Sequence, residues 1–290
     1  AVSDLNGSYG SLQYSKNVHN AVMRIIELNP SFVLITGDMV AGQKVGLDYE
    51  KMWDSFFKAF VVPLTIKNIP VLVTPGNHDA SEYSKFSKER EIYKRRWKRY
   101  YLENKNLFSR FKLIDDSNYP FHYSFGFQNV LLQSIDATTT KSLSLFQMNK
   151  IRKNLKSNFF HKVVFSHMPF VPFAKKREQD YIHDKNKNQF LEIQSLGVDY
   201  FVSGHHHVFY PGLFSGSHVI SNACLGSGAR LLIGDSKRSQ VSFSLFTVSE
   251  SMISVDALVA PNFQKKIERK SLISKIITQE FTITRDDLNE

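Results

Sequence analysis

An apolar run that ends in polar residues constrains this chain more than any other feature. Residues 71–75, Val-Leu-Val-Thr-Pro, are typical of a buried strand, and they lead directly into residues 76–79, Gly-Asn-His-Asp. The loop therefore presents a carboxamide, an imidazole and a carboxylate, which are metal-ligand or acid–base groups. One such loop proves little alone, so the ends of the other predicted strands matter as much.

Four other predicted strands also end in a potential ligand, and these ends carry Asp4, Asp38, His167 and His205. Because sites in open α/β sheets form outside the carboxyl ends of the strands, we expect all five ends to supply one edge of the fold. On an extended backbone His205 and His207 point to one face, and His206 points away. Asp4 and Asn6 have the same spacing.

The combined set of groups predicts a metal centre without sulfur. Its carboxylates, carboxamides and imidazoles are Asp4, Asp38, Asn6, Asn77, His167, His205 and His207. Such donors suit Mn, Fe, Zn, Ni or Co. The set is too large for one tetrahedral ion and fits two divalent transition-metal ions that share a bridging carboxylate. Each residue taken singly has a structural alternative, since a lone Asp often caps a turn and a lone His is often structural.

Composition and charge exclude some classes of protein and favour some classes of partner. The single cysteine, Cys224, excludes an internal disulfide framework and a thiolate metal cage. No apolar stretch is long enough to cross a bilayer. The net charge of +10 favours anionic partners such as phosphate esters, nucleic acid or a membrane surface, although solubility alone can also account for it.

The remaining pattern predicts a single α/β domain over residues 1–290, with the motifs in residues 1–210, a β-rich segment 211–260 and a terminal extension 261–290. Helices are predicted over 15–29, 48–62, 81–105, 145–155 and 186–196. Strands are predicted up to residues 4–7 and over 32–36, 70–75, 121–125, 129–135, 162–166, 198–203, 217–222, 224–234, 241–248 and 252–259. We expect Pro63 to break the second helix, Gly126 to join strands 121–125 and 129–135, and the extension to contain a helix and a strand at 280–284.

The predicted helix 81–105 is strongly basic, and aromatic residues alternate with its charges. One interpretation is a surface that contacts phosphate or nucleic acid. The other is an amphipathic helix whose aromatic side chains pack inward while its charges stay solvated. The glutamates in the same segment offset some of the charge and favour the second interpretation.

Five sequence blocks together resemble the calcineurin-like metallophosphoesterase family. They are Asp4-Leu5-Asn6, Gly37-Asp38, Gly76-Asn77-His78-Asp79, Ser166-His167 and Gly204-His205-His206-His207, in this order within residues 1–210. The Gly-Asn-His-Asp and Gly-His-x-His blocks are the specific ones. The resemblance implies a four-layer α/β/β/α sandwich, with two mixed β-sheets flanked by helices and a dinuclear metal site at the carboxyl edge of the strands.

The resemblance also implies a role for each site residue. Asp38 would bridge the metals, Asp4 and His207 would complete one metal site, and Asn77, His167 and His205 would complete the other. His78 would sit beside the metals and act on the phosphoryl group or the leaving oxygen.

Two positions depart from patterns within the family. Asn6 stands where most members have a ligating His, and its side-chain oxygen is a harder and poorer donor than imidazole. The first metal is therefore expected to be weaker, exchangeable or of different identity. Ala41 stands where purple acid phosphatases have a ligating Tyr, which disfavours that Fe(III)–tyrosinate subtype.

The predicted activity is metal-dependent hydrolysis of phosphate esters, with phosphomonoesters preferred. Two cations about 3.5–4 Å apart can hold a bridging hydroxide for in-line attack and neutralise the developing charge. In this hypothesis Asp38 and His78 are catalytic, and Asn77, His78 and Arg230 contact the substrate.

Two alternatives stay open. The first is a phosphodiesterase or nuclease that acts on nucleotides or nucleic acid; the basic loop residues Lys175, Lys176, Arg177 and His183 are candidate phosphate contacts for either ester. The second is a non-catalytic scaffold of the same fold that binds partners, which the retained His78 argues against. The abrupt start at Ala1 predicts a missing upstream segment, either a cleaved leader of an exported protein or a truncated end.

Overall fold

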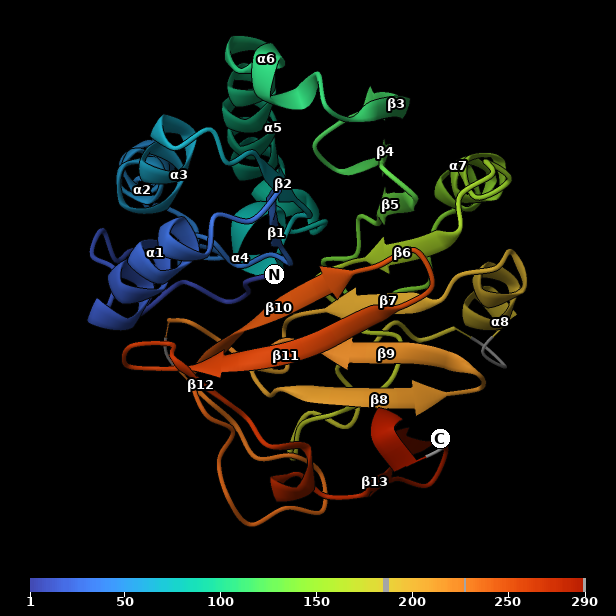
Figure 1. The fold of residues 1–290 in the computed structure, drawn as a ribbon. Coiled ribbons are helices and arrows are strands. Elements are labelled where there is room, and N and C mark those ends of the chain that lie inside the picture. Colours follow the sequence, from blue (N-terminus) through green and yellow to red (C-terminus); the bar gives the residue numbers. More distant parts are fainter. Residues whose placement is uncertain (185–187, 227, 289–290) are drawn as a thin grey trace.

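The structure is a computed structural model that describes residues 1–184, 188–226 and 228–288. Helices and sheets stack as helix, sheet, sheet and helix (Figure 1), which confirms the predicted mixed α/β class and its layered order. One buried apolar cluster lies between the two sheets and under the N-terminal helices. A second cluster lies between the larger sheet and the helices on its outer face.

The larger layer is a nine-stranded mixed sheet in the order β13-β14-β8-β9-β7-β6-β5-β4-β3. The pairs β5–β6, β6–β7 and β7–β9 are parallel, and the other pairs are antiparallel. The parallel strands consist almost wholly of buried residues, because both of their faces are covered. The strands are β3 (Lys112–Asn118), β4 (His122–Phe127), β5 (Val130–Ser134), β6 (His161–Phe165), β7 (Tyr200–Ser203), β8 (Tyr210–Phe214), β9 (Ser217–Ser221), β13 (Lys275–Ile277) and β14 (Thr282–Arg285).

The smaller layer is assembled from two groups of strands that the first residues of the chain connect. β1 (Val33–Ile35) and β2 (Val71–Val73) are parallel, whereas β10 (Ser242–Val248), β11 (Ile253–Val259) and β12 (Lys265–Lys266) are antiparallel. Ala1 exchanges two hydrogen bonds of 2.6 and 2.9 Å with Ser244 of β10. Val2 forms a parallel bridge to Ile35 of β1. The predicted first strand is thus reduced to a bridge, since the backbone leaves the extended region at Asp4.

The helices are α1 (Lys16–Leu28), α2 (Tyr49–Phe56), α3 (Val62–Ile66), α4 (Asn77–Ala80), α5 (Ser87–Glu103), α6 (Lys105–Phe108), α7 (Leu145–Asn154) and α8 (Asn188–Ser195). α1, α2, α3 and α5 lie on the side of the smaller sheet, and α7 and α8 cover the larger one (Figure 1). The first two residues of the predicted helix 186–196 lie outside the described residues. Within the described residues of the chain, no helix has the length and apolar character needed to cross a membrane.

α5 packs its aromatic side chains inward, which confirms the amphipathic interpretation. Tyr93, Trp97 and Tyr100 are buried in the cluster between the sheets and the N-terminal helices. The Tyr100 hydroxyl accepts a hydrogen bond of 3.1 Å from the backbone N–H of Val71. Tyr123 of β4 both accepts from and donates to the backbone of Val73. These hydroxyls satisfy the free edge of β2, which delivers the central motif.

Pro63 does not end the second predicted helix, which corrects the expectation. A π-helical turn at Phe57–Val61 follows α2 and leads into α3, where Pro63 occupies the first turn. The Val62 N–H bonds to the Phe57 carbonyl, so the helix is continuous, and the π-helical turn just before Pro63 is the local irregularity that accommodates the missing donor of proline.

Four other predictions at the level of elements are wrong. Gly126 lies within β4, and the turn to β5 falls at residues 128–129. Strands β3 and β8 are present although the sequence did not indicate them. The described residues of 224–234 form only isolated bridges, because their N–H groups bond to the carbonyls of Ser3, Asp4 and His207. In the described residues of the extension the predicted helix is absent and two 3₁₀ turns occur, whereas β14 confirms the predicted strand at 280–284 and β12 and β13 are additional strands.

Candidate metal centre

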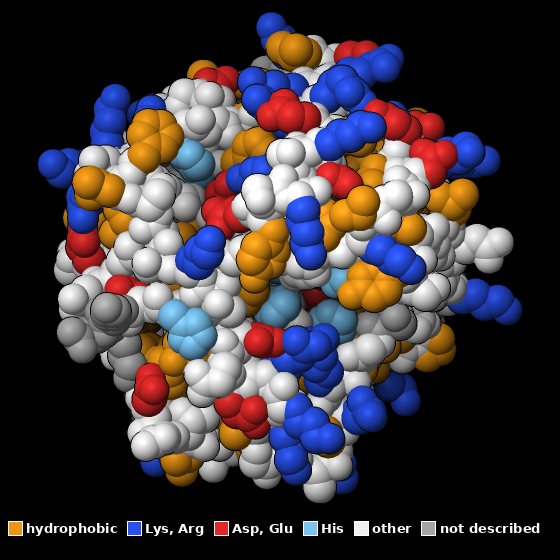
Figure 2. Space-filling model, turned by 180° about the vertical axis from the view of Figure 1, so that it is seen from behind, with side chains coloured by type: hydrophobic (Ala, Val, Ile, Leu, Met, Phe, Trp, Pro, Cys, Tyr) orange, Lys and Arg blue, Asp and Glu red, His pale blue; other side chains and the backbone are white. Residues whose placement is uncertain are grey.

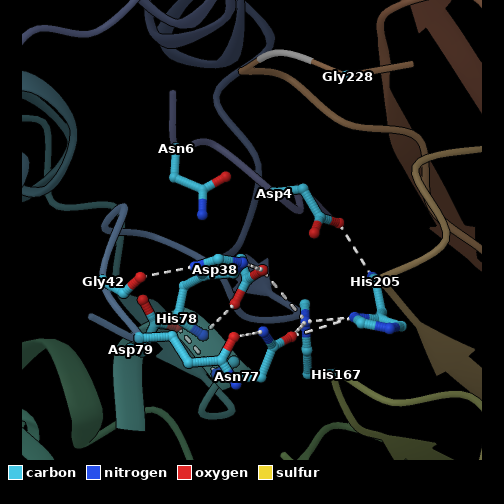
Figure 3. A network of polar contacts seen from close by, with 12 residues as sticks. Asp4, Asn6, Asp38, Gly42, Asn77, His78, Asp79, His167, His205 and Gly228 are labelled. Carbon is cyan, nitrogen blue, oxygen red and sulfur yellow. Dashed lines mark hydrogen bonds and ion pairs between the residues drawn. The ribbon is translucent and has the colours of Figure 1, made fainter. Parts of the chain in front are cut away.

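The predicted strand ends meet at one edge of the two sheets (Figure 3). β1 leads to Asp38, β2 to Asn77 at the start of α4, β6 to His167 and β7 to His205, while Asp4 follows the N-terminal bridge. Asp4, Asp38 and His167 each offer a ligand atom, and these atoms lie within 4.8 Å of one another. Segments that are far apart in the sequence therefore supply one cluster.

Several site residues have a left-handed backbone, which is uncommon outside glycine. Asp4, Asp38, His205 and His207 have φ values of 52°, 55°, 65° and 55°. Such conformations cost free energy and collect at functional sites. They correct the premise that residues 205–207 are extended, although His205 and His207 both still face the site.

Two glycines of the sequence blocks are required by close approach of the backbone. A Cβ atom on Gly76 would lie 2.1 Å from the backbone nitrogen of Asp38. A Cβ atom on Gly204 would lie 2.0 Å from the hydroxyl of Ser3. Neither position accepts a side chain without moving a neighbour that holds a candidate ligand.

Each carboxylate is held through one oxygen and presents the other to the cluster. Asp4 Oδ2 accepts hydrogen bonds from the Ser3 hydroxyl (2.6 Å) and the His205 backbone N–H (3.1 Å). Asp38 Oδ1 accepts from the His78 backbone N–H (2.9 Å), and Oδ2 lies 3.4 Å from His167 Nε2. The other oxygen of each carboxylate therefore has a fixed orientation toward the cluster.

Asn77, His167 and His205 bring three ligand atoms together. Asn77 Oδ1 is 2.9 Å from His167 Nε2 and 3.1 Å from His205 Nδ1, and the two ring nitrogens are 3.2 Å apart. Ligand atoms about 2.1 Å from a common ion lie about 3.0 to 3.4 Å from each other in octahedral or tetrahedral coordination. The observed separations fit this range, so these residues suit a divalent metal ion.

The protonation of the two imidazoles differs. His167 Nδ1 lies 2.8 Å from the Thr36 carbonyl, which only accepts, so this nitrogen carries a hydrogen and Nε2 faces the cluster. Burial opposes a charge on His167, but the carboxylate of Asp38 raises its pKa to about 9. Burial lowers the pKa of His205 to about 4, so its ring is neutral at pH 7. The cluster of acceptor atoms thus attracts a positive charge, either a proton or a metal ion.

His207 and Asn6 belong to the part of the site around Asp4. His207 Nε2 is 3.0 Å from Asp4 Oδ1, and although burial opposes protonation, Asp4 raises the pKa of His207 to about 10. The Asn6 amide Nδ2 donates to the Val40 carbonyl (3.2 Å), which leaves the amide oxygen as the remaining ligand atom of this side chain.

His78 lies beside the cluster and reaches solvent. Its Nδ1 is 2.8 Å from the Gly42 carbonyl and therefore carries a hydrogen, while Nε2 lies 3.9 Å from Asp38 Oδ2. The side chain of His78 is 22% exposed. The exposed ring of Tyr9 lies 5.3 Å from it, measured between centroids. A face of the molecule shows histidine side chains within a hollow bordered by cationic and hydrophobic groups (Figure 2).

Arg230 and Arg177, one of the basic loop residues, are engaged with the protein itself. Arg230 Nη1 donates to the His205 carbonyl (2.6 Å), and Arg177 pairs with Asp180 (2.5 Å). The substrate contact predicted for Arg230 stays a prediction.

Sequence reasoning missed residues that support the ligands. Asp79 is fully buried and accepts from the backbone of Met39, Val40 and Gly76, which locks two strand ends together. Gln43 accepts from the Asn77 amide, and Asp180 lies 3.8 Å from His205 Nε2. The position of Asp79 inside the Gly-Asn-His-Asp block was a signal; Gln43 and Asp180 lie in loops that carry none.

Comparison with known structures gives the same architecture. A dimetal phosphatase from Danio rerio is 15% identical, with a TM-score of 0.60 over 88% of this chain and 94% of that chain. A purple acid phosphatase from yellow lupin (Lupinus luteus) is 13% identical, with a TM-score of 0.62. That match covers 89% of this chain but only 50% of the lupin chain. GAP50, the anchor in the inner membrane complex of Plasmodium, is 14% identical, with a TM-score of 0.52 over 89% and 82% of the two chains.

Identity this low supports the fold alone, and the comparison with curated proteins gives no match. The family assignment comes from the sequence. The model of the calcineurin-like phosphoesterase family matches residues 1–209, which include every block that forms the cluster. The chain therefore belongs to the calcineurin-like phosphoesterase family.

Proposed function

We propose that the chain is a metal-dependent phosphoesterase that hydrolyses phosphomonoesters in preference to diesters. The observation that carries the proposal is the convergence of Asn77 Oδ1, His167 Nε2 and His205 Nδ1 at separations of 2.9 to 3.2 Å. A proton on His167 Nε2 can hold these atoms together as hydrogen bonds, and a divalent ion that replaces the proton would bind all three atoms. Family membership supports the same conclusion.

The ligands form two sets that share Asp38. Asn77, His167 and His205 would hold one divalent ion, and Asp4, His207 and Asn6 the other, with Mn, Fe, Zn or Ni as candidates. When bound, such ions supply an activated water and neutralise charge at the phosphoryl group during in-line displacement. Thr36 orients His167 through its carbonyl, as outer partners of metal ligands commonly do.

His78 is the candidate acid or hydrogen-bond donor for the leaving oxygen. The Gly42 carbonyl fixes its Nδ1–H, which directs Nε2 toward Asp38 and the ligand cluster. Its partial exposure gives an ester access to the ring. A positioned imidazole of this kind typically contributes about 10²–10⁴-fold to the rate.

The charge pattern on α5 favours a small ester over nucleic acid. Arg95 and Arg96 both pair with Glu50 of α2, and Arg99 pairs with Glu103. These arginines are thus neutralised within the protein and leave less free charge for a phosphate backbone. A chain that hydrolysed oligonucleotides with a steep salt dependence would favour the nuclease alternative instead.

The test is hydrolysis of one chromogenic phosphomonoester and one phosphodiester after chelation and return of Mn, Zn, Fe or Ni. Asn77→Ala removes the oxygen among the three converging atoms, and Asn106→Ala at an exposed position of α6 is the matched control. We expect metal-dependent turnover, faster on the monoester, that Asn77→Ala abolishes and Asn106→Ala retains. No turnover with any metal in the folded protein would instead support the partner-binding scaffold.

A further inference from the structure

The carboxamide of Asn77 is held by contacts on both its oxygen side and its nitrogen side. Its Oδ1 faces the nitrogens of His167 and His205, and its Nδ2 donates to Gln43 Oε1 at 2.8 Å. The inner side of the amide therefore faces imidazole nitrogens, which accept or donate according to their tautomer, and the outer side faces the amide oxygen of Gln43. A ring nitrogen without a hydrogen would accept from the amide nitrogen, and one with a hydrogen would donate to the amide oxygen, so the inner contacts alone permit both orientations of the amide.

The Asn77 side chain therefore has two competing orientations. With the oxygen inward it offers a metal ligand, and with the nitrogen inward it donates hydrogen bonds to the imidazole and offers none. The choice between these two orientations depends on the group that meets the carboxamide on its outer side, which is the side away from His167 and His205. An outer acceptor selects the inward oxygen, and an outer donor selects the inward nitrogen.

Gln43 is built into this outer position. Its backbone has a φ of 65°, an unusual value for a side chain of this size. The hydroxyl of buried Tyr49 holds the Gln43 backbone N–H at 2.7 Å. The preceding residue, Gly42, supplies the carbonyl that orients His78. One short loop thus supports both central residues of the Gly-Asn-His-Asp block.

We propose that Gln43 is a positioning residue that turns the Asn77 carboxamide oxygen toward His167 and His205 and so sets the metal affinity of that half of the centre. The inference rests on the proposed function, because it assumes that a metal ion binds there. Glutamine can itself turn to accept or donate, so the natural pair retains both orientations. Substitutions at position 43 that only accept, only donate or do neither should separate the two orientations.

The test is calorimetric titration of the chelated protein with Mn²⁺. Gln43→Glu only accepts and should bind at least as tightly as the unmodified chain. Gln43→Lys only donates and should bind about 10–100-fold more weakly, the usual range for lost outer partners of a metal ligand. Gln43→Met is neutral and should lie between the two.

Variants at Val45, in the same loop, control for the effect of the added charge alone. Val45 is 66% exposed, so Val45→Glu and Val45→Lys introduce the same charges without meeting the carboxamide. We expect the effect at position 43 to exceed the effect at position 45 for each charge. The neutral Met variant, with thermal unfolding as a check on folding, keeps the test independent of charge.

The outcomes separate this inference from the proposed function. Equal Mn²⁺ affinity for the unmodified chain, Gln43→Met and Gln43→Lys would overturn the role of Gln43 and leave the metal centre intact. No Mn²⁺ binding by the unmodified chain would overturn the proposed function and this inference with it. Weakening in the order Glu, Met, Lys would establish the orientation mechanism.

Discussion

The two proposed halves of the metal centre, which would share Asp38, are prepared for a cation to different degrees. On one side, Asn77, His167 and His205 place three ligand atoms within 3.2 Å of each other. On the other side, His207 is already paired with Asp4, and Asn6 donates its amide to Val40.

The difference shows how a single residue can make the metal affinities of the two halves unequal. An imidazole at position 6 would be a softer and stronger donor than the carboxamide that stands there. An ion on either side has to displace a proton, because the pKa of His207 is raised to about 10 and that of His167 to about 9, so the difference between the halves comes from position 6. We therefore expect one tight and one weak metal.

The largest effect should come from the residue that both halves share. Asp38→Asn removes a charge from each set while the backbone contact of Oδ1 can persist. Turnover should fall by more than about a hundredfold, since loss of an outer partner alone costs about 10–100-fold. Assay with a chromogenic monoester, beside Asp54→Asn at an exposed position of α2 as control, checks this; equal loss in both variants would contradict it.

The next largest effect should distinguish the halves by metal affinity. His167→Ala should remove the tighter step of a Mn²⁺ titration, because its ring touches both Asn77 and His205. His207→Ala should remove only the weaker step. Exposed His19→Ala serves as the control. If His207→Ala removed the tighter step, the expected order of the two halves would be reversed.

A smaller effect should come from restoring the imidazole at position 6. Asn6→His should tighten the weaker step by about tenfold, through the stronger donor, and leave the tighter step unchanged. Asn6→Ala should weaken that step further, but by less than Asn6→His tightens it, because the carboxamide oxygen is a poor donor. A tighter step that responded to Asn6→His would place position 6 in the other half.

The smallest expected effect concerns Arg230, which holds the backbone of His205. Arg230→Met removes a hydrogen bond to the His205 carbonyl and should weaken the tighter metal by about fivefold, the equivalent of about 1 kcal/mol. The Michaelis constant should stay unchanged at saturating metal. A rise in the Michaelis constant alone would show that the substrate contact predicted from the sequence is correct.

The sequence predicted the fold class and the meeting of the strand ends because both follow from local patterns and sheet topology. Apolar runs ending at Asp38, Asn77, His167 and His205 needed only the rule that sites form at the carboxyl ends of strands. The packing of Trp97 and its aromatic neighbours on α5 also followed from helical spacing.

What the sequence missed depends on contacts between distant loops. The left-handed backbone at His205 and His207 overturned the extended geometry assumed for them. Gln43 supports Asn77 across 34 positions of sequence, and no periodicity encodes such a contact. The segment around Cys224 was predicted as a strand, yet Leu225 bonds to the N-terminal Ser3 instead of to a ladder.

The most direct test is a Mn²⁺ titration of the chelated, unmodified chain with turnover of a chromogenic monoester recorded at each addition. We predict two binding steps of unequal affinity, with turnover that appears as the second, weaker step fills. Binding of two ions with equal affinity would contradict the inequality of the halves. Absence of binding and turnover in the folded protein would contradict the metal centre itself.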